Sequence, residues 1–131
     1  MMSSNINFIC GWSGLLLGFL SGTALGMFFH QENWLGGYGS LKRRLYRLGH
    51  ISFFGLGVVN LMFAFTARNF SLPPQVMQLS AAMFIVGAVS MPMCCILMAH
   101  YPKTRLLFAV PILSLLTGGI GVLSATFKLL R

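Results

Sequence analysis

The sequence predicts an all-α integral membrane protein, an antiparallel bundle of four transmembrane helices, and three observations carry this prediction. Apolar residues make up 56% of the chain and charged residues only 8%, whereas a soluble domain carries about a quarter charged residues. The apolar residues gather into long runs, each able to cross a hydrocarbon core of about 30 Å. Basic residues flank these runs instead of interrupting them. We therefore expect a single membrane domain over residues 1–131.

The first run, residues 8–29, is too long for a cleaved signal and has no basic segment before it. As a helix it would extend about 33 Å. Four of its glycines are spaced by four: Gly14, Gly18, Gly22 and Gly26. His30 is the next position in the same series. Positions four apart lie on neighbouring turns and drift by about 40° per step, so these glycines predict a shallow groove for another helix.

A polar loop follows, and the chain then reads as an amphipathic turn over 41–47 that leads into a second span, 48–66. Ser40 is placed to cap this helix. Gly57 and Asn60 lie on the narrow face of the second span. Because Asn60 falls deep in the bilayer, we expect its amide to make a hydrogen bond to another helix.

The third span, 75–99, follows two prolines that suit a helix start, and Pro92 inside it predicts a bend. A short basic turn, 100–105, leads to the fourth span, 106–127, whose small face includes Gly118 and Gly121. Every span therefore offers one narrow face. Such faces suit close helix packing in lipid, where the hydrophobic effect does not drive association.

Charge predicts the orientation. Six basic residues lie in the first and third connections: Lys42, Arg43, Arg44, Arg47, Lys103 and Arg105. The opposite side carries Arg68, Lys128 and Arg131. By the positive-inside rule, loops 30–47 and 100–105 are cytoplasmic and both termini lie outside, most simply in a bacterial inner membrane. The net charge of +8 thus indicates contact with the lipid bilayer and not with nucleic acid.

This topology brings the three histidines to one side of the membrane: His30, His50 and His100. Two histidines from facing helices, His50 with His30 or His100, can supply both axial ligands of a b-type haem. Its propionates would be neutralised by arginines of the same side: Arg43, Arg44, Arg47 or Arg105. A weaker hypothesis is a zinc or copper site made of these histidines and Glu32, which lacks the compact ligand spacing of known motifs. The competing interpretation is that histidines at helix ends are simply solvated near lipid headgroups.

No catalytic residues are predicted, because the chain has one acidic residue and no paired carboxylates or nucleophile motif. The first prediction is a non-enzymatic accessory or assembly subunit that packs, through its glycines, against other membrane subunits or itself. The alternatives are a haem- or metal-binding redox or haem-handling protein and a small solute or metal transporter. The segment from Arg44 to Asn60 resembles, in architecture alone, small bacterial membrane proteins that hold haem or assist oxidase assembly.

Overall fold

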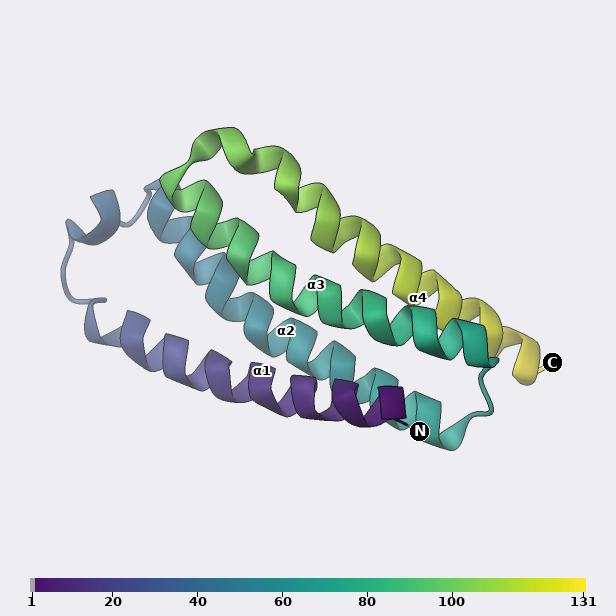
Figure 1. Ribbon diagram of the computed structural model, residues 1–131. Coiled ribbons are helices and arrows are strands. Elements are labelled where there is room, and N and C mark those ends of the chain that lie inside the picture. Colours follow the sequence, from purple (N-terminus) through teal and green to yellow (C-terminus); the bar gives the residue numbers. More distant parts are fainter. Residues whose placement is uncertain (1) are drawn as a thin grey trace.

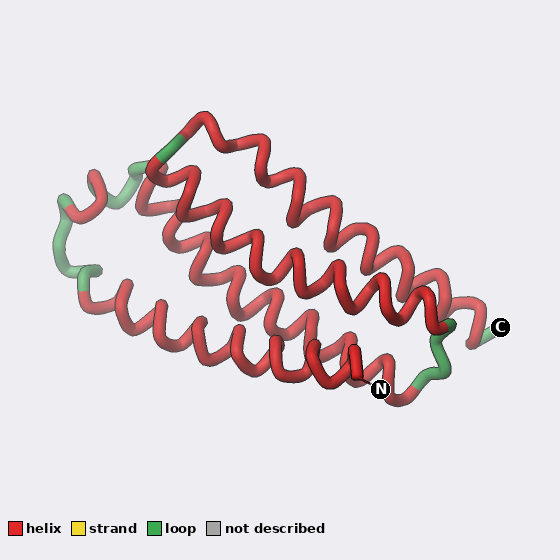
Figure 2. Tube along the Cα trace, in the orientation of Figure 1, coloured by secondary structure: helices red, strands yellow, loops and turns green. Residues whose placement is uncertain are grey.

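The computed structural model describes residues 2–131, with side chains from Ser4 onward, and these residues are helical with short connections (Figures 1 and 2). The long helices are α1 (Met2–Met27), α2 (Leu41–Asn69), α3 (Pro74–His100) and α4 (Ala109–Leu129), and the short 3₁₀ helices are η1 (Trp34–Gly36) and η2 (Pro102–Phe108). Four helical segments, the last formed by η2 and α4 together, are long and apolar enough to cross a membrane.

The first helix begins earlier than the sequence predicted, whereas the second begins where the Ser40 cap predicted. α1 starts at Met2 and ends at Met27, because polar residues before the apolar run, such as Asn7, are buried against other helices. α2 is one helix from Leu41 to Asn69 and includes the amphipathic turn. As predicted, Ser40 caps it, and its side chain accepts a hydrogen bond of 3.1 Å from the backbone N–H of Arg43.

Prolines explain where the last two helices begin. α3 starts at Pro74, where the missing N–H would have no helical partner, and it continues as one helix through Pro92. The sequence predicted a fourth helix from residue 106, but residues 102–108 form a 3₁₀ helix and α4 starts at Ala109. This start places Pro111 in the first turn of α4, where proline removes no intrahelical hydrogen bond.

The helices form an open row, in which each long helix packs on the next one in the chain and α1 also reaches α3 (Figure 1). Among the described residues, no Cα of α4 comes within 8 Å of a Cα in α1 or α2. The loop with η1 and the turn with η2 lie at one end of the row, and the termini lie at the other (Figure 1). We call these the loop end and the terminal end.

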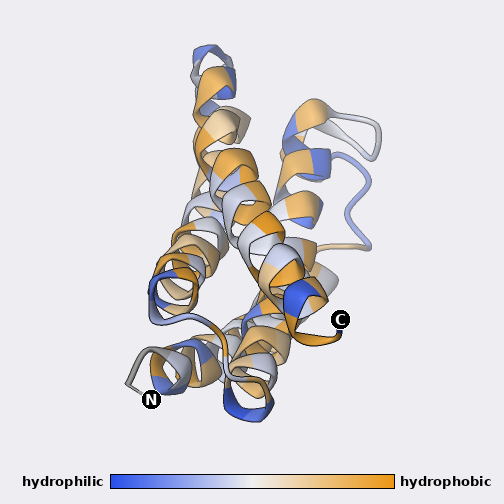
Figure 3. Cartoon of the chain, turned by 90° about the vertical axis from the view of Figure 1, so that its right-hand side faces the viewer, coloured by the Kyte–Doolittle hydropathy of each residue, from blue (hydrophilic) through white to orange (hydrophobic). Residues whose placement is uncertain are grey.

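Hydrophobic residues recur along all four long helices (Figure 3), and many of the large ones are exposed. In the most apolar 18-residue stretch of each outer segment, Ser4–Met27 and Pro102–Leu129, only 17% of the residues are buried. The corresponding share in each of the two middle helices is 33%. Large side chains such as Phe19 and Leu123 are 66% and 70% exposed. A surface this apolar needs lipid or protein around it.

Glycines allow α1 and α2 to approach each other closely. A Cβ on Gly14 would lie 3.0 Å from Phe53 O and 3.1 Å from Gly57 Cα, and both of these atoms belong to the backbone. A Cβ on Gly18 would lie 2.7 Å from the Phe54 ring, and one on Gly22 would lie 2.7 Å from His50 Cε1. The predicted groove therefore faces α2 and is filled by it.

The contact stripe on α1 does not keep the predicted spacing of four. It alternates between three and four residues: Ser4, Asn7, Gly11, Gly14, Gly18, Ser21 and Leu25. A strict spacing of four rotates by about 40° per step, so Gly26 has turned about 120° away from Gly14. A Cβ on Gly26 would meet nothing within 4 Å. The alternating spacing is the one that helices crossing at small angles use.

Two buried asparagines link three helices. Asn7 on α1 donates from Nδ2 to Asn60 Oδ1 on α2 (2.7 Å) and to Ala81 O on α3 (3.1 Å). Asn60 donates from Nδ2 to Leu56 O (2.9 Å) and to Phe84 O on α3 (3.3 Å). Both asparagine side chains are fully buried. The interhelical bond expected of Asn60 is therefore present, and its partner is a residue that the sequence placed outside the first span.

α4 packs on α3 through small residues. A Cβ on Gly118 would lie 3.0 Å from the Phe84 ring, and one on Gly121 would lie 2.9 Å from Ser80 Oγ. The Ser80 hydroxyl donates to Gly118 O at 3.1 Å. Buried apolar residues continue this contact from α2 to α4: Phe63, Leu72, Ala81, Phe84 and Ala125.

We predict that Gly14→Ala destabilises the protein by about 1–3 kcal/mol, because backbone atoms of α2 leave no space for a methyl group. Gly26→Ala is the matched control, since its methyl group would enter open space. Thermal unfolding in mild detergent measures both. Equal unfolding temperatures for the two variants would contradict the close α1–α2 contact.

We predict that Asn60→Leu costs about 1–2 kcal/mol, because the buried Asn7 amide loses its acceptor. The double variant Asn7→Leu/Asn60→Leu removes both polar groups, so its loss should be smaller than the sum of the single losses. Unfolding by denaturing detergent gives all three values. Additive losses would show that the two side chains do not interact.

Candidate functional site

At the loop end, the segment 28–40 folds around one buried cation, Arg43 of α2. Its side chain is only 2% exposed. Nη2 donates to Phe29 O (3.2 Å), and Nη1 donates to the carbonyl oxygens of Gln31 and Glu32 (3.4 Å each). These carbonyls follow the C-terminus of α1, where the helix dipole is negative, so a cation is favoured there.

Aromatic rings surround the same guanidinium. Its carbon lies 5.2 Å from the ring centre of Phe29, 5.7 Å from that of Trp34 and 5.0 Å from that of Tyr38. Cation–π attraction is strongest when the cation has little water around it, as here. Phe28 also stacks on Trp34 at 5.3 Å. Arg43 of α2 is therefore the main side chain that holds the loop to this helix.

The backbone of the loop turns sharply at η1. Leu35, Gly36 and Gly37 have φ values of 55°, 85° and 93°. Glycine tolerates this left-handed region, but leucine does not do so without strain. The Ser40 hydroxyl holds Leu35 by donating to its carbonyl oxygen at 2.7 Å. Ser40 thus stabilises both the turn and the start of α2.

His50 lies inside the helix contact and not at a free surface. Its Nδ1 is 3.0 Å from Ser21 Oγ, and the Ser21 hydroxyl donates to Gly18 O at 3.1 Å. Because a hydroxyl has one proton, which Ser21 donates to Gly18 O, the Nδ1–H of His50 donates to Ser21 Oγ. The ring packs against Gly22, and Phe54 meets it edge-on at 5.4 Å.

His100 makes a different contact, with Tyr46 of α2. Its Nε2 lies 2.9 Å from the Tyr46 hydroxyl. This bond joins the last residue of α3 to the second turn of α2. His100 is exposed, so the pair lies at the surface of the loop end.

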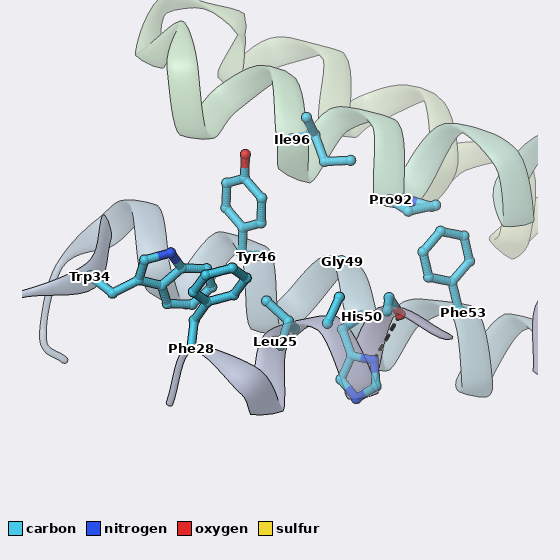
Figure 4. A pocket seen from close by; sticks show the side chains of 11 residues that line it. Leu25, Phe28, Trp34, Tyr46, Gly49, His50, Phe53, Pro92 and Ile96 are labelled. Carbon is cyan, nitrogen blue, oxygen red and sulfur yellow. Dashed lines mark hydrogen bonds between the residues drawn. The ribbon is translucent and has the colours of Figure 1, made fainter. Parts of the chain in front are cut away.

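A cavity of about 280 Å³ lies between α1 and α3, with α2 as its floor. Figure 4 shows Phe28 and Trp34 at one end, Phe53 and Pro92 at the other, and the Ser21–His50 bond at its edge. Carbon atoms make nearly the whole wall. No lysine, arginine or acidic side chain lines the cavity, so its shape and chemistry suit an apolar occupant.

The structure does not gather the predicted metal ligands. His30 and Glu32 are exposed in the loop, because α1 has ended at Met27 before the glycine series reaches His30. His50 is bonded to α1, and His100 is bonded to Tyr46. Within residues 2–131 as described, no group of three or more His, Cys, Asp and Glu side chains could hold a metal ion. The predicted site of three histidines and a carboxylate has no counterpart here.

The predicted cationic partners of a haem are differently placed. Arg44 is exposed, and the guanidinium carbon of Arg47 lies 4.8 Å from the ring centre of Tyr38. Arg43, the third arginine of this group, is unavailable to an anionic ligand because it is buried in the loop. The sequence could not separate Arg43 from its neighbours, since Lys42, Arg43 and Arg44 form one basic run.

Comparison with known protein families, with curated proteins and with solved structures finds no match to this chain.

We predict that Arg43→Gln loosens the loop, because three carbonyl oxygens and three aromatic rings lose the guanidinium. Arg43→Lys should rescue only part of the effect, since an ammonium lacks the planar fork. Amide hydrogen exchange of residues 28–40 should rise by about tenfold or more in Arg43→Gln. Exposed Arg44→Gln is the control, and an equal rise there would refute the role of Arg43.

Proposed function

We propose that this chain is an antiparallel four-span membrane protein that acts as a non-enzymatic accessory or assembly subunit of a larger membrane complex. The membrane setting is supported by four apolar segments and by large apolar side chains on outward faces. The orientation follows from the basic residues of the loop end, which place that end in the cytoplasm and both termini outside. A bacterial inner membrane is the simplest location for such a chain.

The single observation that carries the proposed function is a groove between α2 and α4. Its volume is about 390 Å³, and α3 forms its floor. Its lining includes Val58, Met62, Phe63, Phe84, Gly119, Leu123 and Thr126. The groove exists because α4 packs on α3 without reaching α2. We infer that a helix of another membrane subunit, or of a second copy, fills it.

Gly119 of this groove supports a helix as the occupant. A Cβ on Gly119 would meet nothing within 4 Å, so the backbone of α4 is open to close approach there. The remaining lining of the groove is mainly apolar, which suits the side chains of a membrane-spanning helix.

In this proposal, the glycine series on α1 packs against α2 and does not bind the partner. Gly14, Gly18 and Gly22 are already covered by α2, so their replacement would test the fold and not the partner. The docking face is therefore assigned to α2 and α4. An accessory role fits this arrangement, because the chain uses its own small residues to fix α1 and leaves a separate apolar face open.

We predict that Gly119→Leu abolishes association while the helices stay folded, because leucine fills the groove and is a better helix former than glycine. The measurement is the mass of the complex extracted in mild detergent, by size-exclusion chromatography with light scattering, together with the co-purified proteins. Gly26→Leu adds the same side chain at an open position outside the groove and should leave the complex intact. A wild-type protein that is a clean monomer without partners would refute the proposal.

The alternatives remain predictions with their own tests. A haem-handling role is favoured by the bond between His50 Nδ1 and Ser21, because such a bond is the kind that orients metal-binding histidines. A Soret band that is lost in His50→Ala would support it, and its absence after reconstitution with haem would refute it. Transport of a solute or metal would require uptake by liposomes that contain the purified protein.

A further inference from the structure

A second hollow lies on the other side of the row, between α1 and α3. The cavity of about 280 Å³ at the loop end adjoins one of about 300 Å³ nearer the terminal end, and both are lined by Phe53, Pro92 and Ile96. We call this continuous hollow the α1–α3 cleft. It runs along α1 from Phe28 to Cys10, which is about 27 Å of helix and nearly the thickness of a hydrocarbon core.

The lining of the cleft suits an apolar occupant, because carbon atoms make nearly all of its surface. Three of its polar side chains near the loop end are bonded within the chain: Ser21 and His50 bond to each other, and Tyr46 bonds to His100. Gly14, Gly49 and Gly57 also line the cleft and add no polar side chain to it. An empty apolar space loses dispersion contacts, and in a bilayer a hydrocarbon chain can supply them.

The charge at the loop end indicates which kind of lipid supplies the acyl chain. Besides buried Arg43, five basic residues lie there: Lys42, Arg44, Arg47, Lys103 and Arg105. The only carboxylate side chain in the sequence is Glu32. The cleft opens beside Trp34 and Tyr46 at this same end, and these amphipathic rings are typical of the headgroup level of a membrane.

We propose that the α1–α3 cleft binds one acyl chain of an anionic phospholipid whose phosphate is held by the basic residues of the loop end. The phosphate lies outside the cleft, among the basic side chains of the loop end, of which Arg44 is exposed. The acyl chain lies inside and contacts Phe53, Pro92 and Ile96. This inference rests on the proposed membrane setting but not on the proposed partner, which uses the opposite side of the row.

Native mass spectrometry tests the site by counting lipids that stay bound to the full chain. The detergent-purified protein is mixed with phosphatidylglycerol or with phosphatidylcholine of identical acyl chains. We expect one retained phosphatidylglycerol and weaker retention of phosphatidylcholine. Ala24→Phe and Ala88→Phe place a ring in the two halves of the cleft, and each should lower retention by at least about tenfold. Ala109→Phe, at an exposed position outside the cleft, should not.

A separate pair of double variants tests whether lipid binding depends on the basic residues of the loop end. Arg44→Gln/Arg47→Gln should lower the preference for phosphatidylglycerol by about thirtyfold, whereas Lys128→Gln/Arg131→Gln at the terminal end should not change it. Helical circular dichroism and unfolding temperature show that each variant is folded. Retention unchanged by both ring-bearing variants, equal binding of the two lipids, or a co-extracted neutral prenyl lipid in the cleft would overturn the proposal. Gly119→Leu leaves the cleft intact, so lipid retention there separates this proposal from the partner proposal.

Discussion

The hydrogen bonds of Asn7 and Asn60 hold three helices together where water is absent, and most other features of the fold depend on them. The two amides connect α1, α2 and α3 through one another and through the backbone carbonyls of Ala81 and Phe84. Breaking them would leave polar groups buried without partners, which is more costly than the net value of the bonds. The glycines of α1 then let its backbone lie against Gly57. Nothing comparable ties α4 to α1 or α2 in the described chain, so the row stays open.

The four apolar segments were predictable, because length and hydropathy determine what can cross a bilayer. The cap at Ser40 was predictable because a serine directly before a helix can accept a bond from a free backbone N–H. The interhelical bond of Asn60 was predictable because an amide inside an apolar span needs a partner. The arrangement of the helices was not. Hydropathy suggested that the first helix begins at the apolar run and hid the role of Asn7. A strict spacing of four glycines suggested that Gly26 and His30 continue the contact, whereas rotation of the helix turns Gly26 away and α1 ends before His30.

The contacts of the candidate site residues were even less predictable from the sequence than the arrangement of the helices. Three histidines at one depth suggested a shared ligand, but side-chain direction separates them: His50 bonds to Ser21, His100 bonds to Tyr46, and His30 lies exposed in the loop. Arg43 became a structural residue because its neighbours fold over it, and no local pattern distinguishes it from Lys42 or Arg44. What the structure adds are two apolar hollows on opposite sides of the row. We assign the α2–α4 groove to a partner helix and the α1–α3 cleft to lipid.

The open row is the central claim, and a distance between the outer helices tests it directly. Spin labels on Leu16→Cys of α1 and Leu116→Cys of α4, with Cys10, Cys94 and Cys95 replaced by alanine, report that distance by electron paramagnetic resonance in membranes. The open row predicts a separation well beyond that of directly packed helices, whose axes lie about 8–10 Å apart. A short distance typical of packed helices would show that α4 closes onto α1, and the proposed docking face would then be lost.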